Sequence, residues 1–142
     1  MTAFHRVLGT VVVLAFVAIM VWALVLWLRR RDELPDGLRA VQHWTENLLV
    51  VQTVTGLLLL LIGRRVVTAM DDAWLHYLYG SLFPLVALVG GRLAALRRER
   101  RAYLGLAWGS LFAFGLTLRA VQTACAAPLG DLPACMLRGL GG

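Results

Sequence analysis

Two histidines stand where each could ligate the same metal group. His5 opens the first long apolar run of the chain, and His76 opens the third. Two imidazoles at equal depth on different helices can hold a b-type haem, because haem iron accepts axial imidazoles. Arg119, near the end of the fourth run, would supply a charge-assisted hydrogen bond to a propionate. The sequence therefore raises a haem b hypothesis, with iron as the metal. The interpretation it favours over this one is that both histidines are interfacial residues with solvated tips.

A second group of polar residues lies at the start of the second apolar run. Helical spacing puts Gln42 and Glu46 on one face, with His43 and Asn47 beside them. A quinone or proton-handling site uses such donors and such a carboxylate. The alternative is a solvated helix start in which Glu46 pairs with Arg39 or Arg31. The chain has no phosphate-binding glycine loop, no His-Glu-x-x-His pattern and no Gly-x-Ser-x-Gly pattern, so we predict no catalytic residue and do not expect an enzyme.

These residues must be positioned by membrane helices. Hydrophobic residues make up 60% of the chain and charged residues 15%, against about 45–50% and about 25% in a soluble domain. A spanning helix needs about 20 apolar residues. The apolar runs predict spans at 4–28, 43–62, 73–96 and 103–124, with a kink at Pro84 and an earlier helix start at Pro35 or Asp36. We expect an all-α integral membrane protein, a four-transmembrane-helix bundle forming one domain over residues 1–142.

The distribution of arginine predicts the orientation of the spans. The net charge of +6 comes from arginine alone, without any lysine. If the N-terminus is outside, the inner segments carry nine arginines and the outer segments carry five. Positive residues concentrate on the cytoplasmic side, so we expect a multi-pass protein of the cell (inner) membrane with both termini on the outer, periplasmic side. The arginines flank apolar runs instead of lining a groove, which argues against a nucleic-acid partner.

The C-terminal segment 125–142 is rich in glycine and proline and predicts a short irregular outer tail. Cys125 and Cys135 lie in it with nine residues between them. Outside the cytoplasm such a pair is expected to be oxidised, and closing a loop of this size contributes roughly 2–3 kcal/mol. The alternatives are two free thiols or two metal ligands.

Small residues repeat every four positions in the third and fourth runs. The third contains Ala87, Gly91 and Ala95, and the fourth contains Gly105 and Gly109, followed by Ala113. Small residues allow membrane helices to approach closely. The pattern predicts that these two helices pair tightly, or that one of them pairs with another protein.

Four helices, histidines near the outer face and an outer cysteine pair make the chain similar in architecture to small membrane cytochromes and to one half of haem A synthase. In haem A synthase the paired histidines of a half-bundle lie on its second and fourth helices. Here the candidate pair lies on the first and third. We therefore assign the chain to no family and transfer no residues from one.

Three functions from different classes remain. Ranked first is a non-catalytic accessory or assembly subunit of a larger membrane complex, such as a respiratory or electron-transfer complex, with a partner protein or a second copy in the bilayer. The second is a b-type cytochrome with His5 and His76 as haem ligands. The third is a small transporter or quinone-linked protein that uses His43, Glu46 and Asn47.

Overall fold

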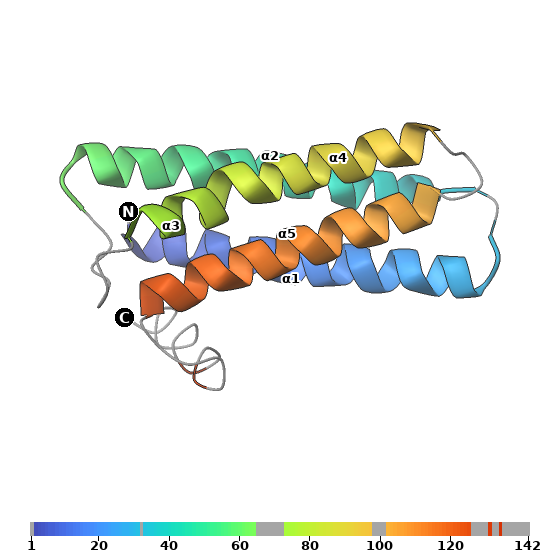
Figure 1. Cartoon of the computed structure of the whole chain (residues 1–142), viewed down its shortest axis with the longest axis horizontal. Helices are drawn as coiled ribbons and strands as arrows, with labels where there is room; N and C mark the ends of the chain where they lie inside the picture. The colour runs from blue at the N-terminus through green and yellow to red at the C-terminus, as the bar shows by residue number, and fades with distance from the viewer. Residues whose placement is uncertain are drawn as a thin grey trace.

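A computed structural model describes residues 2–31, 33–64, 73–97 and 102–125, together with Asp131 and Ala134. All regular structure in this part of the chain is helical. Its elements are α1 (Thr2–Leu28), α2 (Asp36–Leu61), α3 (Ala73–Tyr77), the π-helical turn η1 (Leu78–Leu82), α4 (Phe83–Arg97) and α5 (Ala102–Cys125). The long helices run antiparallel in chain order, so that the start of α1, α3 and the end of α5 lie at one end of a bundle (Figure 1).

Four helical segments are long and apolar enough to cross a membrane, with lengths of 20 to 26 residues. They are Ala3–Leu28, Asp36–Leu61, Trp74–Leu93 and Tyr103–Cys125. They correspond to the predicted spans at 4–28, 43–62, 73–96 and 103–124, which confirms the prediction of an all-α bundle of four candidate transmembrane helices.

The second span begins at Asp36, at the earlier of its predicted starts. The carbonyl of Pro35 accepts hydrogen bonds from the backbone N–H groups of Leu38 and Arg39, at 3.0 and 3.3 Å. Proline suits this position because its fixed φ, here −61°, is compatible with entering a helix. The extra turns carry Gln42, Thr45 and Glu46 into the body of the helix, where they can meet other spans.

The third span is interrupted just before Pro84, where the sequence predicts a kink. The N–H of Phe83 bonds the carbonyl of Leu78 across the wide turn of η1. Proline has no N–H and its ring crowds the carbonyl four residues earlier, so a wider turn at this point relieves the clash. Ser81 donates its hydroxyl to the carbonyl of Tyr77. This turn sets the direction of α3, which carries His76.

The bundle core is built around one stripe of α1. Its buried members recur at spacings of three and four residues, as expected for one face of a helix: Val12, Phe16, Ile19, Ala23 and Leu26. Phe16 is fully buried in a cluster with Leu49 of α2, Leu88 of α4 and Ala113 of α5. All four spans therefore meet at the middle of the bundle.

Helices α4 and α5 approach each other most closely at two glycines. A Cβ atom placed on Gly91 would lie 2.8 Å from the carbonyl oxygen of Gly105 and 3.0 Å from the Cα of Gly109. Only glycine fits here, because the obstructing atoms belong to the backbone and cannot rotate away. The small-residue pattern thus pairs these two helices within the chain. By contrast, α2 packs mainly on α1 and only lightly on α4.

Most of the predicted outer tail lies outside the described residues. Cys125 ends α5, and Cys135 is not among the described residues. The irregular tail at 125–142 and the Cys125–Cys135 disulfide therefore stay predictions.

Candidate functional site

The structure brings the two predicted histidines to the same end of the bundle. His5 lies near the start of α1 and His76 lies on α3, at the end shared with the last turns of α5 (Figure 1). Both side chains are partly buried. An ionisable pair within candidate membrane helices is costly to place and is therefore a candidate functional site.

The imidazole of His76 is held in one orientation by α5. Its Nδ1 lies 2.8 Å from the backbone carbonyl oxygen of Ala120. A carbonyl oxygen can only accept, so Nδ1 must carry the proton and donate it. In the neutral ring Nε2 then carries the lone pair. A histidine that ligates a metal usually donates its other ring N–H in this way, and His76 therefore has the form of a pre-oriented ligand.

The imidazole of His5 pairs instead with an amide of α2. The Nε2 of Gln52 lies 3.2 Å from the Nε2 of His5. The amide nitrogen donates, so in the neutral ring the proton of His5 is on Nδ1. That Nδ1 atom and the Oε1 atom of Gln52 are both buried without a hydrogen-bond partner. Turning the amide over would reverse the contact and still leave one atom of each group unpaired.

Two glycines make room for this pair, and each lies on the opposite helix. A Cβ on Gly56 of α2 would lie 3.1 Å from Cε1 of His5, and a Cβ on Gly9 of α1 would lie 3.0 Å from Nε2 of Gln52. Each polar residue precedes the glycine of its own helix by four positions, which places both on the same face. The arrangement is therefore reciprocal: each side chain sits where the other helix has no side chain.

The sequence predictions did not include Gln52, Gly9 or Gly56 in the site. An available signal was an amide within an apolar run, followed four residues later by a glycine. That signal is ambiguous, because polar residues and glycines in membrane helices also serve helix packing alone. The partner that gives Gln52 its significance is 47 residues away in sequence.

Arg119, the predicted propionate partner, is exposed on α5 beside Ala120. Its Nη1 donates to Oε1 of Gln122. Arg6, also exposed, follows His5 on α1. Both guanidinium groups therefore stand on the elements that carry or anchor the histidine pair, at the edge of the bundle.

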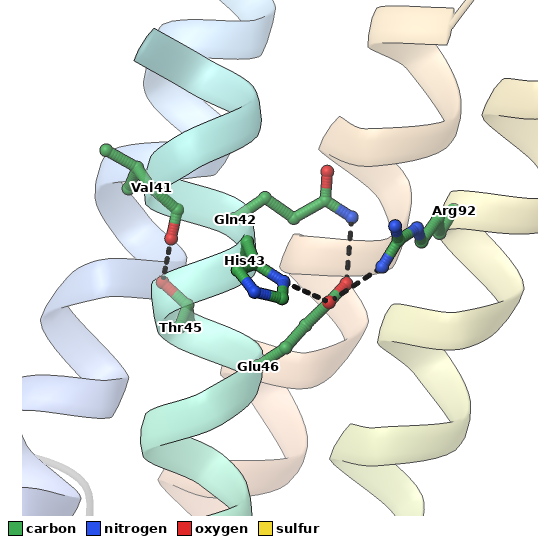
Figure 2. Close-up of polar contacts among 6 residues, drawn as sticks. All are labelled: Val41, Gln42, His43, Thr45, Glu46 and Arg92. Atoms are coloured by element: carbon green, nitrogen blue, oxygen red, sulfur yellow. Dashed lines mark hydrogen bonds and ion pairs between the residues drawn. The ribbon is translucent and has the colours of Figure 1, made fainter. Parts of the chain in front are cut away.

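The second predicted cluster forms a separate network around Glu46 (Figure 2). Nη1 of Arg92, on α4, lies 2.9 Å from Oε2 of Glu46. Nε2 of Gln42 donates to Oε1 of Glu46 at 3.1 Å, and Nδ1 of His43 lies 3.9 Å from Oε2. The hydroxyl of Thr45 is bonded to the Val41 carbonyl of its own helix. Asn47 is exposed.

The cation that pairs with Glu46 differs from the ones expected. The solvated-helix interpretation assigned Arg39 or Arg31, whereas Glu46 is paired with Arg92 of another span. Arg39 lies 3.9 Å from Asp36 in its own first turn. Both carboxylate oxygens of Glu46 have partners, Gln42 on its own helix and Arg92 on α4. The network therefore connects α2 with α4.

We expect Arg92→Met to destabilise the bundle by about 1 kcal/mol, because the largely buried carboxylate of Glu46 would lose a charge-assisted hydrogen bond from a guanidinium that is 57% exposed. The side chain of Glu46 is only 17% exposed. Far-UV circular dichroism during unfolding with a denaturing detergent measures the change. Arg39→Met is the matched control, since Arg39 is similarly exposed but its partner Asp36 is fully exposed. Equal midpoints for both variants would contradict a connecting role for Arg92.

Within the described residues, no group of three or more histidine, cysteine or acidic side chains could hold a metal ion. The donors at the end of the bundle that carries α3 are the imidazoles of His5 and His76 and the amide of Gln52. Two imidazoles suit a metal whose remaining positions are filled by a ligand of its own, as in haem.

No family model, curated protein or solved structure matches this chain.

Proposed function

We propose that this chain is a b-type haem protein of a membrane, in which His5 and His76 would hold the iron. The observation that carries the proposal is that two partly buried histidines from different spans, His5 of α1 and His76 of α3, lie at the same end of the bundle. One of them, His76, is already oriented by a carbonyl so that its Nε2 lone pair is available. The other, His5, is held by the amide of Gln52 from α2.

A bound haem would supply one-electron chemistry between ferrous and ferric iron. The residues of this chain would have three tasks. His5 and His76 would hold the iron from α1 and α3. Arg119 and Arg6 would pair with the propionates at the edge of the bundle. The buried apolar residues of the middle layer would keep water from the inner part of the site, as Phe16 and Leu49 are at most 1% exposed.

The same proposal places the site in the outer half of a cell membrane. The start of α1 and the end of α5 lie at the end that carries the histidines (Figure 1). In the sequence, the segments that this topology puts inside carry nine arginines and those that it puts outside carry five, and positive segments stay in the cytoplasm. With both termini outside, electron exchange would take place near the periplasmic surface.

An absorption spectrum of the full chain in mild detergent tests the proposal. The protein is recorded oxidised and dithionite-reduced, as purified and after titration with ferric haem. We expect a Soret band and a sharp reduced α band, typical of a haem with two axial histidines, at one haem per chain. A correctly helical protein that stays colourless and binds no added haem would overturn the proposal.

An accessory or assembly subunit of a membrane complex is the second candidate. It rests partly on small-residue faces that would accept a partner helix. Gly91 of α4 and Gly109 of α5 pack against each other within the chain, so this pair of small residues is explained without a partner protein. Gly90 faces outward with nothing within 4 Å, and this open position is the feature that still favours a partner. Co-purification of a second protein with a colourless chain would support this candidate over the haem protein.

The Cys125–Cys135 disulfide is proposed together with the outer location of the tail. We expect the intact protein from native membranes to be lighter than its reduced form by the two thiol hydrogens, because an oxidised pair persists only outside the cytoplasm. Mass spectrometry with thiol alkylation, before and after reduction, measures this. Alkylation of both cysteines without reduction would place them in a reducing compartment and contradict both the disulfide and the outer terminus.

A further inference from the structure

Arg92 is an exposed charged residue at the edge of a candidate membrane span. It lies in the last turn of the segment Trp74–Leu93. This end of α4 lies opposite the histidines, at the end of the bundle where α1 ends and α2 begins (Figure 1). A charged group at this depth is costly unless it reaches polar groups of the protein or of the membrane interface. The surroundings of this guanidinium therefore bear on what the chain binds.

Glu46 satisfies only part of this guanidinium. Nη1 of Arg92 lies 2.9 Å from Oε2 of Glu46, and Figure 2 shows the two side chains pointing toward each other between α2 and α4. Within the part of the chain that the structure describes, this is the one polar contact of Arg92. It uses one N–H of a group that carries several in a planar fork. The exposed part of the guanidinium can donate to an acceptor from outside the bundle.

The charges of this network are arranged with the donors outside and the carboxylate inside. The side chain of Glu46 is 17% exposed, whereas those of Arg92 and His43 are 57% and 66% exposed. The other carboxylate oxygen of Glu46, Oε1, accepts from Nε2 of Gln42 at 3.1 Å. An approaching anion therefore meets the guanidinium and the imidazole first, and the carboxylate behind them is already paired.

Exposed apolar side chains continue from this network toward the middle of the bundle. Val50 follows Glu46 by four positions on α2, and Val89 precedes Arg92 by three positions on α4, so each lies one turn further along the same helix face. Both valines are exposed, and α2 packs only lightly on α4. The two helices thus present an apolar seam that begins at a basic group. This pattern fits a molecule with an anionic head and an acyl chain.

We propose that Arg92, flanked by His43, binds the phosphate of an anionic phospholipid at the edge of the seam between α2 and α4. An acyl chain of the lipid lies against Val50 and Val89. Basic sites between membrane helices on the cytoplasmic side bind such headgroups, and the proposed topology puts this end in that anionic leaflet. Arginine suits phosphate because its planar fork donates two parallel hydrogen bonds. The inference requires insertion in a membrane and does not depend on haem binding.

Two substitutions should change lipid binding in opposite directions. Arg92→Met removes the guanidinium, and we expect it to weaken the binding of an anionic phospholipid by about fivefold, the contribution of one arginine near an anionic surface. Glu46→Gln keeps the shape of the side chain but removes its negative charge, so that Arg92 is released toward the lipid. We expect this variant to bind the same lipid more tightly than the unaltered chain, by roughly the same factor.

The experiment is native mass spectrometry of the full chain in mild detergent. The protein is titrated with phosphatidylglycerol and, separately, with phosphatidylcholine of the same acyl chains, and the lipid-bound fraction is measured. Arg39→Met is the matched control, because Arg39 is exposed at the same end of the bundle but lies beside Asp36 in its own first turn. Circular dichroism confirms that each variant is folded, and Glu46→Gln decides the question if Arg92→Met does not fold.

The outcomes distinguish a specific site from general attraction to a basic surface. Weaker phosphatidylglycerol binding in Arg92→Met, tighter binding in Glu46→Gln and unchanged binding in Arg39→Met support the site. Equal effects of Arg92→Met and Arg39→Met would overturn it, and so would equal affinity of the unaltered chain for the two lipids. Inorganic phosphate that competes with the affinity of the lipid itself would show a site for the free anion and overturn the lipid as its occupant.

Discussion

Replacing His76 with alanine is expected to abolish the sharp reduced α band of the haem-loaded protein. His76 is the candidate ligand whose ring is already fixed, through Nδ1–H and the Ala120 carbonyl, with Nε2 left for iron. Without that nitrogen, α3 would supply no ligand to the iron of a bound haem. The loss of haem affinity should exceed the roughly 10–100-fold that removal of a supporting hydrogen bond costs a metal site. Absorbance spectra of the oxidised and reduced protein, with haem titration, measure both effects.

His43→Ala is the matched control for this prediction. His43 is also a histidine near a helix end, but it is exposed and lies beside Glu46 in the first turns of α2. Its removal should leave the spectrum unchanged. A protein that keeps its low-spin spectrum without His76 but loses it without His43 would show that the ligand pair has been assigned to the wrong end of the bundle.

Replacing Gly91 with alanine is expected to have the largest effect on stability. The added methyl group would lie 2.8 Å from the Gly105 carbonyl oxygen and 3.0 Å from the Gly109 Cα. These are backbone atoms, so relief requires α4 and α5 to move apart along their whole contact. Overpacking of this kind costs about 1–3 kcal/mol, and we expect the upper part of that range. Unfolding by a denaturing detergent, followed by far-UV circular dichroism, measures the loss.

Gly90→Ala controls for the intrinsic effect of alanine in a helix. Gly90 is the preceding residue of the same helix, is exposed, and has nothing within 4 Å of the position of an added Cβ. This variant should be as stable as the unaltered chain or slightly more so, because alanine is the better helix former. Two variants of equal stability would mean that α4 and α5 are not held at this close distance.

The His76→Ala and Gly91→Ala predictions test a candidate ligand and the helix packing that positions it. The glycine contact between α4 and α5 fixes the helix that carries Ala120, and the Ala120 carbonyl orients His76. Gly91→Ala should therefore also broaden or weaken the haem spectrum, whereas His76→Ala should leave the helical content intact. Comparing the two variants separates loss of the ligand from loss of the scaffold.

The sequence by itself determined the helices and their number. Four apolar runs of sufficient length, separated by arginine-rich or polar segments, predict four spans, because a bilayer leaves the backbone of a single spanning segment no alternative to its own hydrogen bonds. Pro84 predicts the interruption of the third span for an equally local reason, the missing N–H. Even His5 and His76 could be placed at one end together, since antiparallel spans return the chain to the same side.

Only the tertiary structure decided which side chains meet. In the sequence Gln52 is one polar residue in an apolar run, and only the packing of α1 against α2 shows that it contacts His5. The sequence suggests Arg39 or Arg31 as the partner of Glu46, whereas the packing of α4 gives it Arg92. Both contacts join residues more than 40 positions apart. Hydropathy records that a residue lies in a span, but it records little of the rotation of that span about its axis. That rotation follows from close packing of small residues such as Gly9, Gly56 and Gly91, which depends on all the helices at once.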